Sequence, residues 1–118
     1  MTDHRVWVPV LASTDLVEGG VRQSAAVTPP VAVYRYEGAV FATDDTCTHA
    51  ESSLSEGYFE DGEIECLLHM ARFCVRTGRA MCLPATQALG VYPAREADGV
   101  IEVLVAPESV SVETGAQP

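Results

Sequence analysis

The chain has 118 residues and contains no lysine, so that its seven basic residues are all arginines, against seventeen acidic ones. The resulting formal net charge is −10 at neutral pH. A charge of this sign repels phosphate groups, which argues against nucleic acid and anionic membrane surfaces as partners. The electrostatic complement of such a chain is a basic protein surface.

Long apolar runs are also missing, since none approaches the roughly 18 residues that a transmembrane helix requires. The first residues, Met1 to His4, show no basic segment followed by an apolar core, so no signal peptide is predicted. No glycine-rich phosphate loop for a flavin or nicotinamide is present. We therefore expect a single cytoplasmic domain that does not span a membrane and does not bind a nucleotide cofactor.

Cysteine and histidine are few, but four of them form two short pairs, Cys47-Thr48-His49 and Cys66-Leu67-Leu68-His69, with 16 residues between the pairs. In a chain without an export signal, cysteines indicate metal binding rather than disulfides. Cys74 and Cys82 lie outside the pairs and are interpreted as small buried hydrophobic residues, or as residues facing each other across a hairpin.

Two kinds of metal centre use two cysteines and two histidines. Zinc fingers usually pair cysteine with cysteine and histidine with histidine, and catalytic zinc keeps an open coordination position with a carboxylate nearby. A 2Fe–2S cluster can instead take cysteines on one iron and histidines on the other. Both pairs here are mixed, which favours the cluster, because each loop then supplies one ligand to each iron.

Short β-prone segments separated by turn residues follow one another along the whole chain, and no long helix is indicated. The turns at Glu37-Gly38, Asp61-Gly62 and Asp98-Gly99 predict hairpins, and Pro9 predicts an edge or a bulge. The predicted strands cover residues 5–11, 21–27, 31–36, 39–43, 57–59, 63–65, 72–75, 90–95 and 100–105. This pattern predicts an all-β domain over residues 1–107, and the polar residues 108–118 are predicted to be a flexible tail.

Eight carboxylates and no basic residue occupy the stretch from Asp44 to Glu65, which includes the first pair and ends just before the second. Such a run is either an ordinary solvated face or a docking face for a basic partner. Because the run lies between the two pairs, the docking interpretation has about the same weight as the solvated-face interpretation.

The two pairs match the pattern C-x-H-x(15–17)-C-x-x-H, and with residues 54–58 and 72–78 the chain resembles the Rieske-type 2Fe–2S ferredoxins of bacterial aromatic-ring-hydroxylating dioxygenase systems. The resemblance covers residues 5–106. It implies the Rieske fold, an antiparallel β-sandwich base with a small cluster-binding subdomain inserted at about residues 44–83. Ala50-Glu51 and Met70-Ala71 depart from the family, which often has Gly-Asp and a glycine at these places.

The resemblance implies one Rieske 2Fe–2S cluster, with Cys47 and Cys66 on the buried iron and His49 and His69 on the outer one. It implies a one-electron carrier that accepts electrons from an NAD(P)H-dependent flavin reductase and passes them to a terminal Rieske oxygenase in aromatic compound degradation. The chain is not expected to be an enzyme, because only His4 remains for the mononuclear iron site of an oxygenase. The alternative is a Rieske-type small subunit bound within a larger reductase, such as nitrite reductase.

The reduction potential is predicted to lie at the low end of the Rieske range, near about −150 mV. High-potential members of the family have hydrogen-bond donors two and four residues after the second histidine, where this sequence has Ala71 and Phe73. They also carry a cysteine in each loop that forms a bracing disulfide, where this sequence has Ser52 and Leu68. The negative charges of the carboxylates around the site are also expected to lower the reduction potential.

Overall fold

The computed structural model describes residues 4–47, 52–66, 71–81 and 87–111. Most of the regular structure in these residues is antiparallel β-sheet. The three sheets have the strand orders β1-β10-β9, β2-β3-β4-β8 and β5-β6-β7. Their strands are β1 Val6–Ala12, β2 Val21–Ser24, β3 Val31–Tyr36, β4 Ala39–Asp44, β5 Tyr58–Glu60, β6 Glu63–Glu65, β7 Arg72–Cys74, β8 Val91–Tyr92, β9 Ala94–Ala97 and β10 Val100–Val105. The predicted all-β class is confirmed.

Helical structure in the described residues is limited to three short 3-10 turns, η1 Ser13–Asp15, η2 Leu54–Glu56 and η3 Pro107–Ser109. None of these turns has the length or the apolar character of a bilayer-spanning helix.

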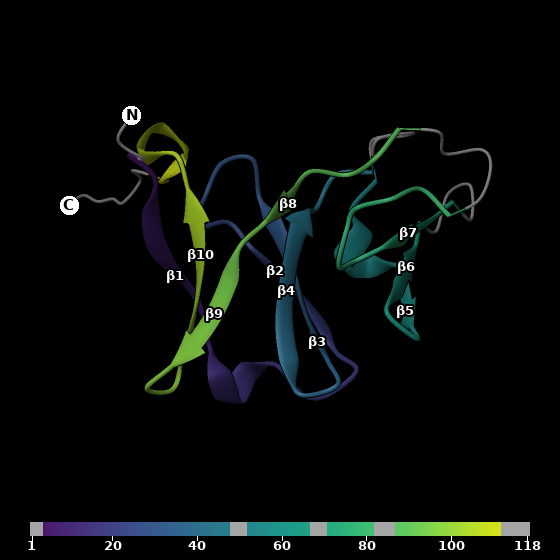
Figure 1. The fold of residues 1–118 in the computed structure, drawn as a ribbon, viewed down its shortest axis with the longest axis horizontal. Coiled ribbons are helices and arrows are strands. Elements are labelled where there is room, and N and C mark those ends of the chain that lie inside the picture. Colours follow the sequence, from purple (N-terminus) through teal and green to yellow (C-terminus); the bar gives the residue numbers. More distant parts are fainter. Residues whose placement is uncertain (1–3, 48–51, 67–70, 82–86, 112–118) are drawn as a thin grey trace.

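The first two sheets stack face to face as a β-sandwich (Figure 1), with a core of aliphatic side chains between them. Ile101, Val103 and Val105 of β10 point into this core, while the residues between them are only partly buried. This alternation is what a strand with one buried face requires. The pairing of β1 with β10 shifts register after Pro9, which confirms the bulge predicted there.

Strand β3 is buried on both faces and joins the sandwich to a second core. Val31 and Val33 belong to the sandwich core, whereas Ala32 and Tyr34 pack into a cluster with side chains of η2, β6 and β7. The short sheet β5-β6-β7 lies beside the sandwich on the far side of this second core (Figure 1). A small subdomain is therefore inserted between β4 and β8, as the resemblance implies, although the bounds 44–83 stay a prediction.

Tight turns connect the hairpins at the three predicted places. In each turn an acidic residue and the glycine after it both have positive φ, with values of 54° and 79° at Glu37 and Gly38. Two successive positive φ angles give the type I′ geometry that matches the twist of two-residue hairpins. The turn sequences therefore fix the register of β3 with β4, β5 with β6, and β9 with β10.

Three predicted segments differ from the structure. The strand expected over residues 21–27 is shorter and ends at Ser24, the last residue of β2. The expected strand 90–95 is divided at Pro93 into β8, which pairs with β4, and β9, which pairs with β10. Proline cannot donate a ladder hydrogen bond, so the chain changes sheets there. Residues 108–111 were expected to begin the tail, but Pro107–Ser109 form η3 and Val110 then forms a bridge with Val27 of the sandwich. Residues 112–118 lie outside the described residues.

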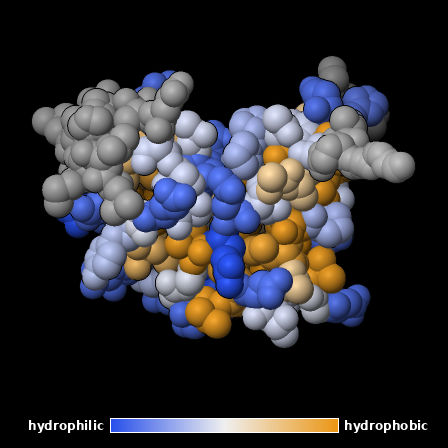
Figure 2. Space-filling view, turned by 180° about the vertical axis from the view of Figure 1, so that it is seen from behind, coloured by the Kyte–Doolittle hydropathy of each residue, from blue (hydrophilic) through white to orange (hydrophobic). Residues whose placement is uncertain are grey.

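Exposed large hydrophobic side chains of the described residues are spread over several elements, and they are Val6, Val17, Tyr58, Met81 and Val91. Figure 2 shows the molecule from behind, where a strip of hydrophilic residues runs between the hydrophobic areas. The hydrophobic surface on this face is therefore divided rather than continuous.

Candidate metal centre

The segment with the first Cys-His pair begins where β4 ends. Cys47 is 3% exposed, and its backbone N–H donates to the carbonyl oxygen of Ser52 at 3.0 Å. One residue further out on each side, Thr46 and Ser53 form an isolated antiparallel bridge. The two ends of this segment are therefore held together, with Cys47 at its base.

The segment with the second pair is closed in the same way. Cys66 follows β6, is fully buried, and donates its backbone N–H to the carbonyl oxygen of Ala71 at 2.8 Å. In both segments the cysteine N–H thus reaches a carbonyl five residues further along the chain. Each predicted thiolate ligand occupies the same position, the first residue of a closed segment that extends from a hairpin.

Both cysteines belong to the second core, together with Leu54, Phe73 and Leu89. The structure therefore brings the two predicted sulfur ligands into the same hydrophobic core, although 18 residues lie between them in the sequence. No disulfide joins any of the cysteines among the described residues. An apolar shell of this kind limits the access of water to sulfur ligands of a metal centre.

The predicted imidazole ligands, His49 and His69, lie outside the described residues and stay predictions. Among the described residues, no three His, Cys, Asp or Glu side chains lie close enough together to hold a metal ion. Of the four predicted ligands the structure describes Cys47 and Cys66, and both are buried. Each histidine follows its cysteine inside a segment whose ends are closed. The donor set fits a group that takes sulfur ligands on its inner side and nitrogen ligands further out.

Cys74 differs from the two candidate ligands. It lies on β7, is only partly buried, and donates its backbone N–H to the carbonyl oxygen of Arg79 at 2.9 Å. Burial raises the pKa of the Cys74 thiol, but hydrogen bonds from Thr77 and the charge of Arg76 outweigh this effect and leave the pKa below its usual value. Its predicted neighbour Cys82 lies outside the described residues.

The acidic run does not form one solvated face. Asp45 is 2% exposed, so the interpretation of the run as solvent-facing is wrong for this residue. The neighbouring Asp44 is partly buried and accepts a short hydrogen bond from the Tyr92 hydroxyl, which together with burial raises the pKa of Tyr92. Nothing in the local sequence distinguishes these two aspartates from the exposed carboxylates further along.

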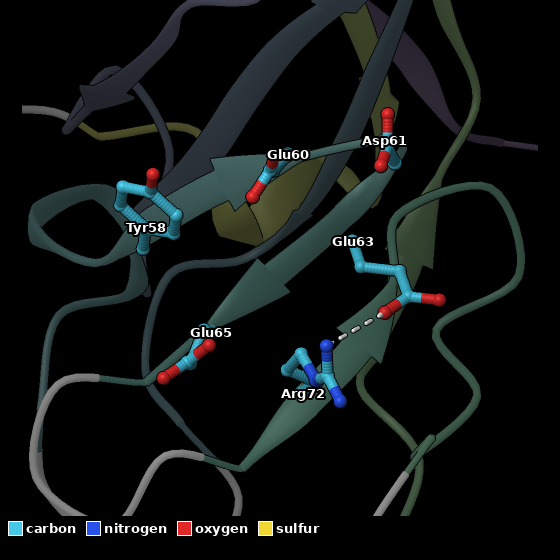
Figure 3. A pocket seen from close by; sticks show the side chains of 6 residues that line it. All are labelled: Tyr58, Glu60, Asp61, Glu63, Glu65 and Arg72. Carbon is cyan, nitrogen blue, oxygen red and sulfur yellow. Dashed lines mark ion pairs between the residues drawn. The ribbon is translucent and has the colours of Figure 1, made fainter.

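Four carboxylates of the run, of which Glu60 and Asp61 are exposed and Glu63 and Glu65 partly buried, line a shallow hollow of about 170 Å³ on the β5-β6-β7 sheet. Figure 3 shows the side chains around it, which are Tyr58, Glu60, Asp61, Glu63, Glu65 and Arg72. Arg72 Nη1 lies 3.8 Å from Glu63 Oε1, an exposed and long ion pair that contributes little to stability. The surface therefore carries an excess of negative charge beside the strands that lead to Cys66.

Comparison with known proteins points to one family. The family model described as "Rieske [2Fe-2S] domain" matches residues 6–93. The chain is 48% identical over 95 residues to the 3-phenylpropionate/cinnamic acid dioxygenase ferredoxin subunit of Photorhabdus laumondii, covering 80% of this chain and 90% of that protein. It is 43% identical over 89 residues to the ferredoxin component of the naphthalene 1,2-dioxygenase system of Pseudomonas putida, covering 75% and 86%.

Among solved structures, the chain is similar to one in the complex of reduced oxygenase and oxidized ferredoxin in carbazole 1,9a-dioxygenase. The TM-score is 0.79 at 36% identity, and the match covers 90% of this chain and 96% of that chain. The similarity thus extends over both β-sandwich and inserted subdomain rather than over the two Cys-His pairs alone.

Proposed function

This chain belongs to the Rieske [2Fe–2S] domain family, and from that premise we propose that it is a one-electron carrier ferredoxin of an aromatic-ring dioxygenase system. It contains one Rieske-type 2Fe–2S cluster and is an electron-transfer component rather than a catalytic oxygenase. The observation that carries the proposal is that Cys47 and Cys66 lie in the same hydrophobic core, each at the base of a segment closed by an equivalent backbone hydrogen bond.

The proposed ligands are Cys47 and Cys66 on the inner iron and His49 and His69 on the outer iron. The cluster supplies a centre that takes up and releases one electron. The buried side chains around the two cysteines exclude water from the sulfur ligands, and the backbone closures hold each cysteine in place. A ligand frame held in this way would limit structural change between the two redox states, which favours electron transfer.

We also propose that the centre has a low potential, near about −150 mV. Ala71 and Phe73, which stand where high-potential relatives have donors, are both completely buried in the core that contains the cysteines. Neither side chain can donate a hydrogen bond that would stabilise an added electron. Their burial in this core supports the prediction from the sequence.

The proposed partners are a terminal Rieske oxygenase as electron acceptor and an NAD(P)H-dependent flavin reductase as donor. The matched chain in the carbazole 1,9a-dioxygenase structure comes from a complex of oxygenase and ferredoxin, which supports the first partner. The excess of carboxylates on the β5-β6-β7 surface supports a basic docking surface on at least one of them. Consumption of NAD(P)H by the donor makes the cytoplasm the proposed compartment.

The alternative of a subunit bound permanently within a larger reductase has less support. A permanent interface requires a large and continuous apolar surface. The exposed large hydrophobic side chains of the described residues are instead spread over separate elements, and a hydrophilic strip divides the hydrophobic surface on the face seen in Figure 2. The relatives at 43–48% identity are ferredoxin components of dioxygenase systems.

The experiment that tests the proposed function replaces a known carrier with this protein. The purified holoprotein is added to the reductase and oxygenase of the naphthalene 1,2-dioxygenase system in place of their own ferredoxin, and NADH-dependent product formation is measured. Before this assay, a coulometric titration counts the electrons that each chain accepts. We expect one electron per cluster and a product rate that depends on the added carrier. Uptake of no electron would contradict the proposal.

A further inference from the structure

We propose that Asp45 is a positioning residue for the cluster, because its hydrogen bonds fix the base of the segment that carries Cys47. The proposal rests on the proposed function, since it assumes that Cys47 is a cluster ligand. It concerns a residue of the acidic run that the sequence predicts to be either a solvated face or a docking face, and the structure buries this residue almost completely.

The carboxylate of Asp45 accepts hydrogen bonds from three groups on two separate parts of the chain. Oδ2 accepts from Gln23 Nε2 of β2 at 2.7 Å and also from the hydroxyl of Ser53, in a short hydrogen bond. Oδ1 accepts from the backbone N–H of Ser55 in η2 at 2.8 Å. The side chain therefore connects the sandwich to the segment that returns from the first Cys-His pair.

The backbone of Asp45 reinforces these connections. Its N–H donates to the carbonyl oxygen of Pro30 at 3.1 Å, and its carbonyl oxygen accepts from the N–H of Leu54 at 2.6 Å. The Thr46–Ser53 bridge follows directly, and then the hydrogen bond from Cys47 to Ser52. Asp45 is thus the first of three consecutive residues that join the outgoing and returning sides of the segment, and it is the one whose side chain also reaches the sandwich.

The surroundings explain why this brace is needed. A hollow of about 320 Å³ lies at the base of the segment, lined by Gln23, Pro30, Asp45, Thr46, Ser52 and Ser53. The hollow is open to solvent, so the hydrogen bonds of Asp45, rather than apolar packing, connect Gln23 on one side of it with Ser53 on the other. A buried carboxylate is costly unless donors surround it, and here Gln23 and Ser53 from the walls of the hollow and the backbone N–H of Ser55 supply them.

The test compares four variants of the full-length holoprotein. Asp45→Ala removes both side-chain acceptors, whereas Asp45→Asn keeps Oδ1 for Ser55 and allows the Gln23 amide and the Ser53 hydroxyl to turn and accept. Ser53→Ala removes one connection and serves if Asp45→Ala does not fold. Ile101→Ala, in the sandwich core, lowers overall stability without touching the segment and is the matched control.

The readouts are backbone amide exchange in the peptides that cover residues 45–56 and the iron content with the EPR line shape. For Asp45→Ala we expect exchange faster by at least about tenfold and cluster occupancy reduced by about half or more, because the closures open more often. Ser53→Ala should show a smaller increase in the same peptides. Asp45→Asn should remain within about twofold of the wild type.

The inference would be overturned if Asp45→Ala had the same amide exchange rates and the same cluster occupancy as the wild type. It would also be overturned if Asp45→Asn failed as badly as Asp45→Ala, or if Ile101→Ala produced the same local exchange and the same loss of cluster. A wild-type protein without a Rieske signal would instead contradict the proposed function. The exchange comparison at residues 45–56 would still test the brace in that case, because it reports on the segment itself.

Discussion

At the scale of single residues, similar side chains have different roles because their surroundings differ. Cys47 and Cys66 are buried at the bases of two closed segments, whereas Cys74 lies partly exposed on β7. Asp45 is enclosed by hydrogen-bond donors, while Asp61 in the same acidic run is exposed in a hairpin turn. The sequence distinguishes the cysteines through their spacing to histidine. It does not distinguish the aspartates, because burial depends on residues far away in the chain, such as Gln23.

The different roles of the cysteines lead to the first prediction. Cys47→Ser and Cys66→Ser should each reduce the cluster content of the purified protein by at least about tenfold, because a serine hydroxyl is a poor ligand for iron in place of a thiolate. Cys74→Ser should retain the cluster. Visible absorption and iron analysis measure the difference. Loss of the cluster in Cys74→Ser alone would contradict the assignment.

A second residue prediction concerns the ion pair between Arg35 and Glu96, in which Nη1 and Nη2 donate to the two carboxylate oxygens at 2.9 and 2.8 Å. The hydrogen bonds from Arg35, with smaller contributions from the Ser13 side chain and the charge of Arg35, lower the pKa of Glu96 from 4.5 to about 2. A carboxylate with a lowered folded-state pKa stabilises the protein above its unfolded-state pKa and loses that contribution as the pH falls.

Wild-type protein should therefore be more stable than Glu96→Gln above about pH 4.5, with the difference decreasing towards pH 2. The measurement is the urea midpoint of both proteins across this range. Because the pair is accessible to solvent, the difference should be small and should decrease with added salt. A difference that grew on acidification would show that the pair is not its cause.

At the scale of elements, the hairpins follow from the sequence and the connections between sheets do not. Glu37-Gly38 and Asp61-Gly62 specify type I′ turns locally, so β3 to β6 lie within a residue or two of where they are expected. The division of segment 90–95 at Pro93 depends on two different partner strands, β4 and β10. The attachment of Val110 to Val27 likewise needs a contact that no local pattern encodes.

Gly78 follows the turn after β7, and its carbonyl oxygen accepts a hydrogen bond at 2.8 Å from the N–H of Leu89, which precedes β8. This contact gives the third prediction. The φ of Gly78 is +79°, and an added Cβ would lie 2.3 Å from the carbonyl oxygen of Leu89. Gly99 has nearly the same φ, +81°, with no atom within 4 Å of such a Cβ. The two glycines therefore separate the cost of the backbone conformation from the cost of the steric clash.

Gly99→Ala should lower the free energy of unfolding by about 1–2 kcal/mol, the cost of the left-handed conformation for an L-residue. Gly78→Ala should lower it by at least about 1 kcal/mol more, because the chain near Leu89 must move, and overpacking a tight site costs about that much. Chemical denaturation of both variants tests this. Equal losses would mean that the contact with Leu89 does not constrain the fold.

At the scale of the whole molecule, the net charge of −10 acts on partners rather than on the fold. The acidic side chains around η2 and β5 lie on the inserted subdomain, close in the chain to the first Cys-His pair. The sequence predicts the sign of this surface and the family of the protein. It does not predict which carboxylates are exposed, since that depends on how the subdomain packs against β3.

Electron transfer from a basic partner should therefore depend on ionic strength. The second-order rate constant for electron transfer should fall by about twofold to fivefold when Glu56 and Glu60 are both changed to Gln. In the wild type it should fall by a similar factor when the salt concentration is raised. The control is Asp15→Asn with Glu108→Gln, which removes two charges from turns of the sandwich. Stopped-flow reduction measures the rates. Equal slowing by both double variants would assign the effect to net charge alone.

The central claim, that two cysteines and two histidines hold a Rieske cluster which carries one electron, is tested most directly by the EPR spectrum of the dithionite-reduced protein. We expect a rhombic signal whose average g value is clearly below that of clusters with four cysteine ligands, because nitrogen ligands on one iron change the electronic structure of the reduced centre. A colourless, EPR-silent protein that contains zinc would contradict the account.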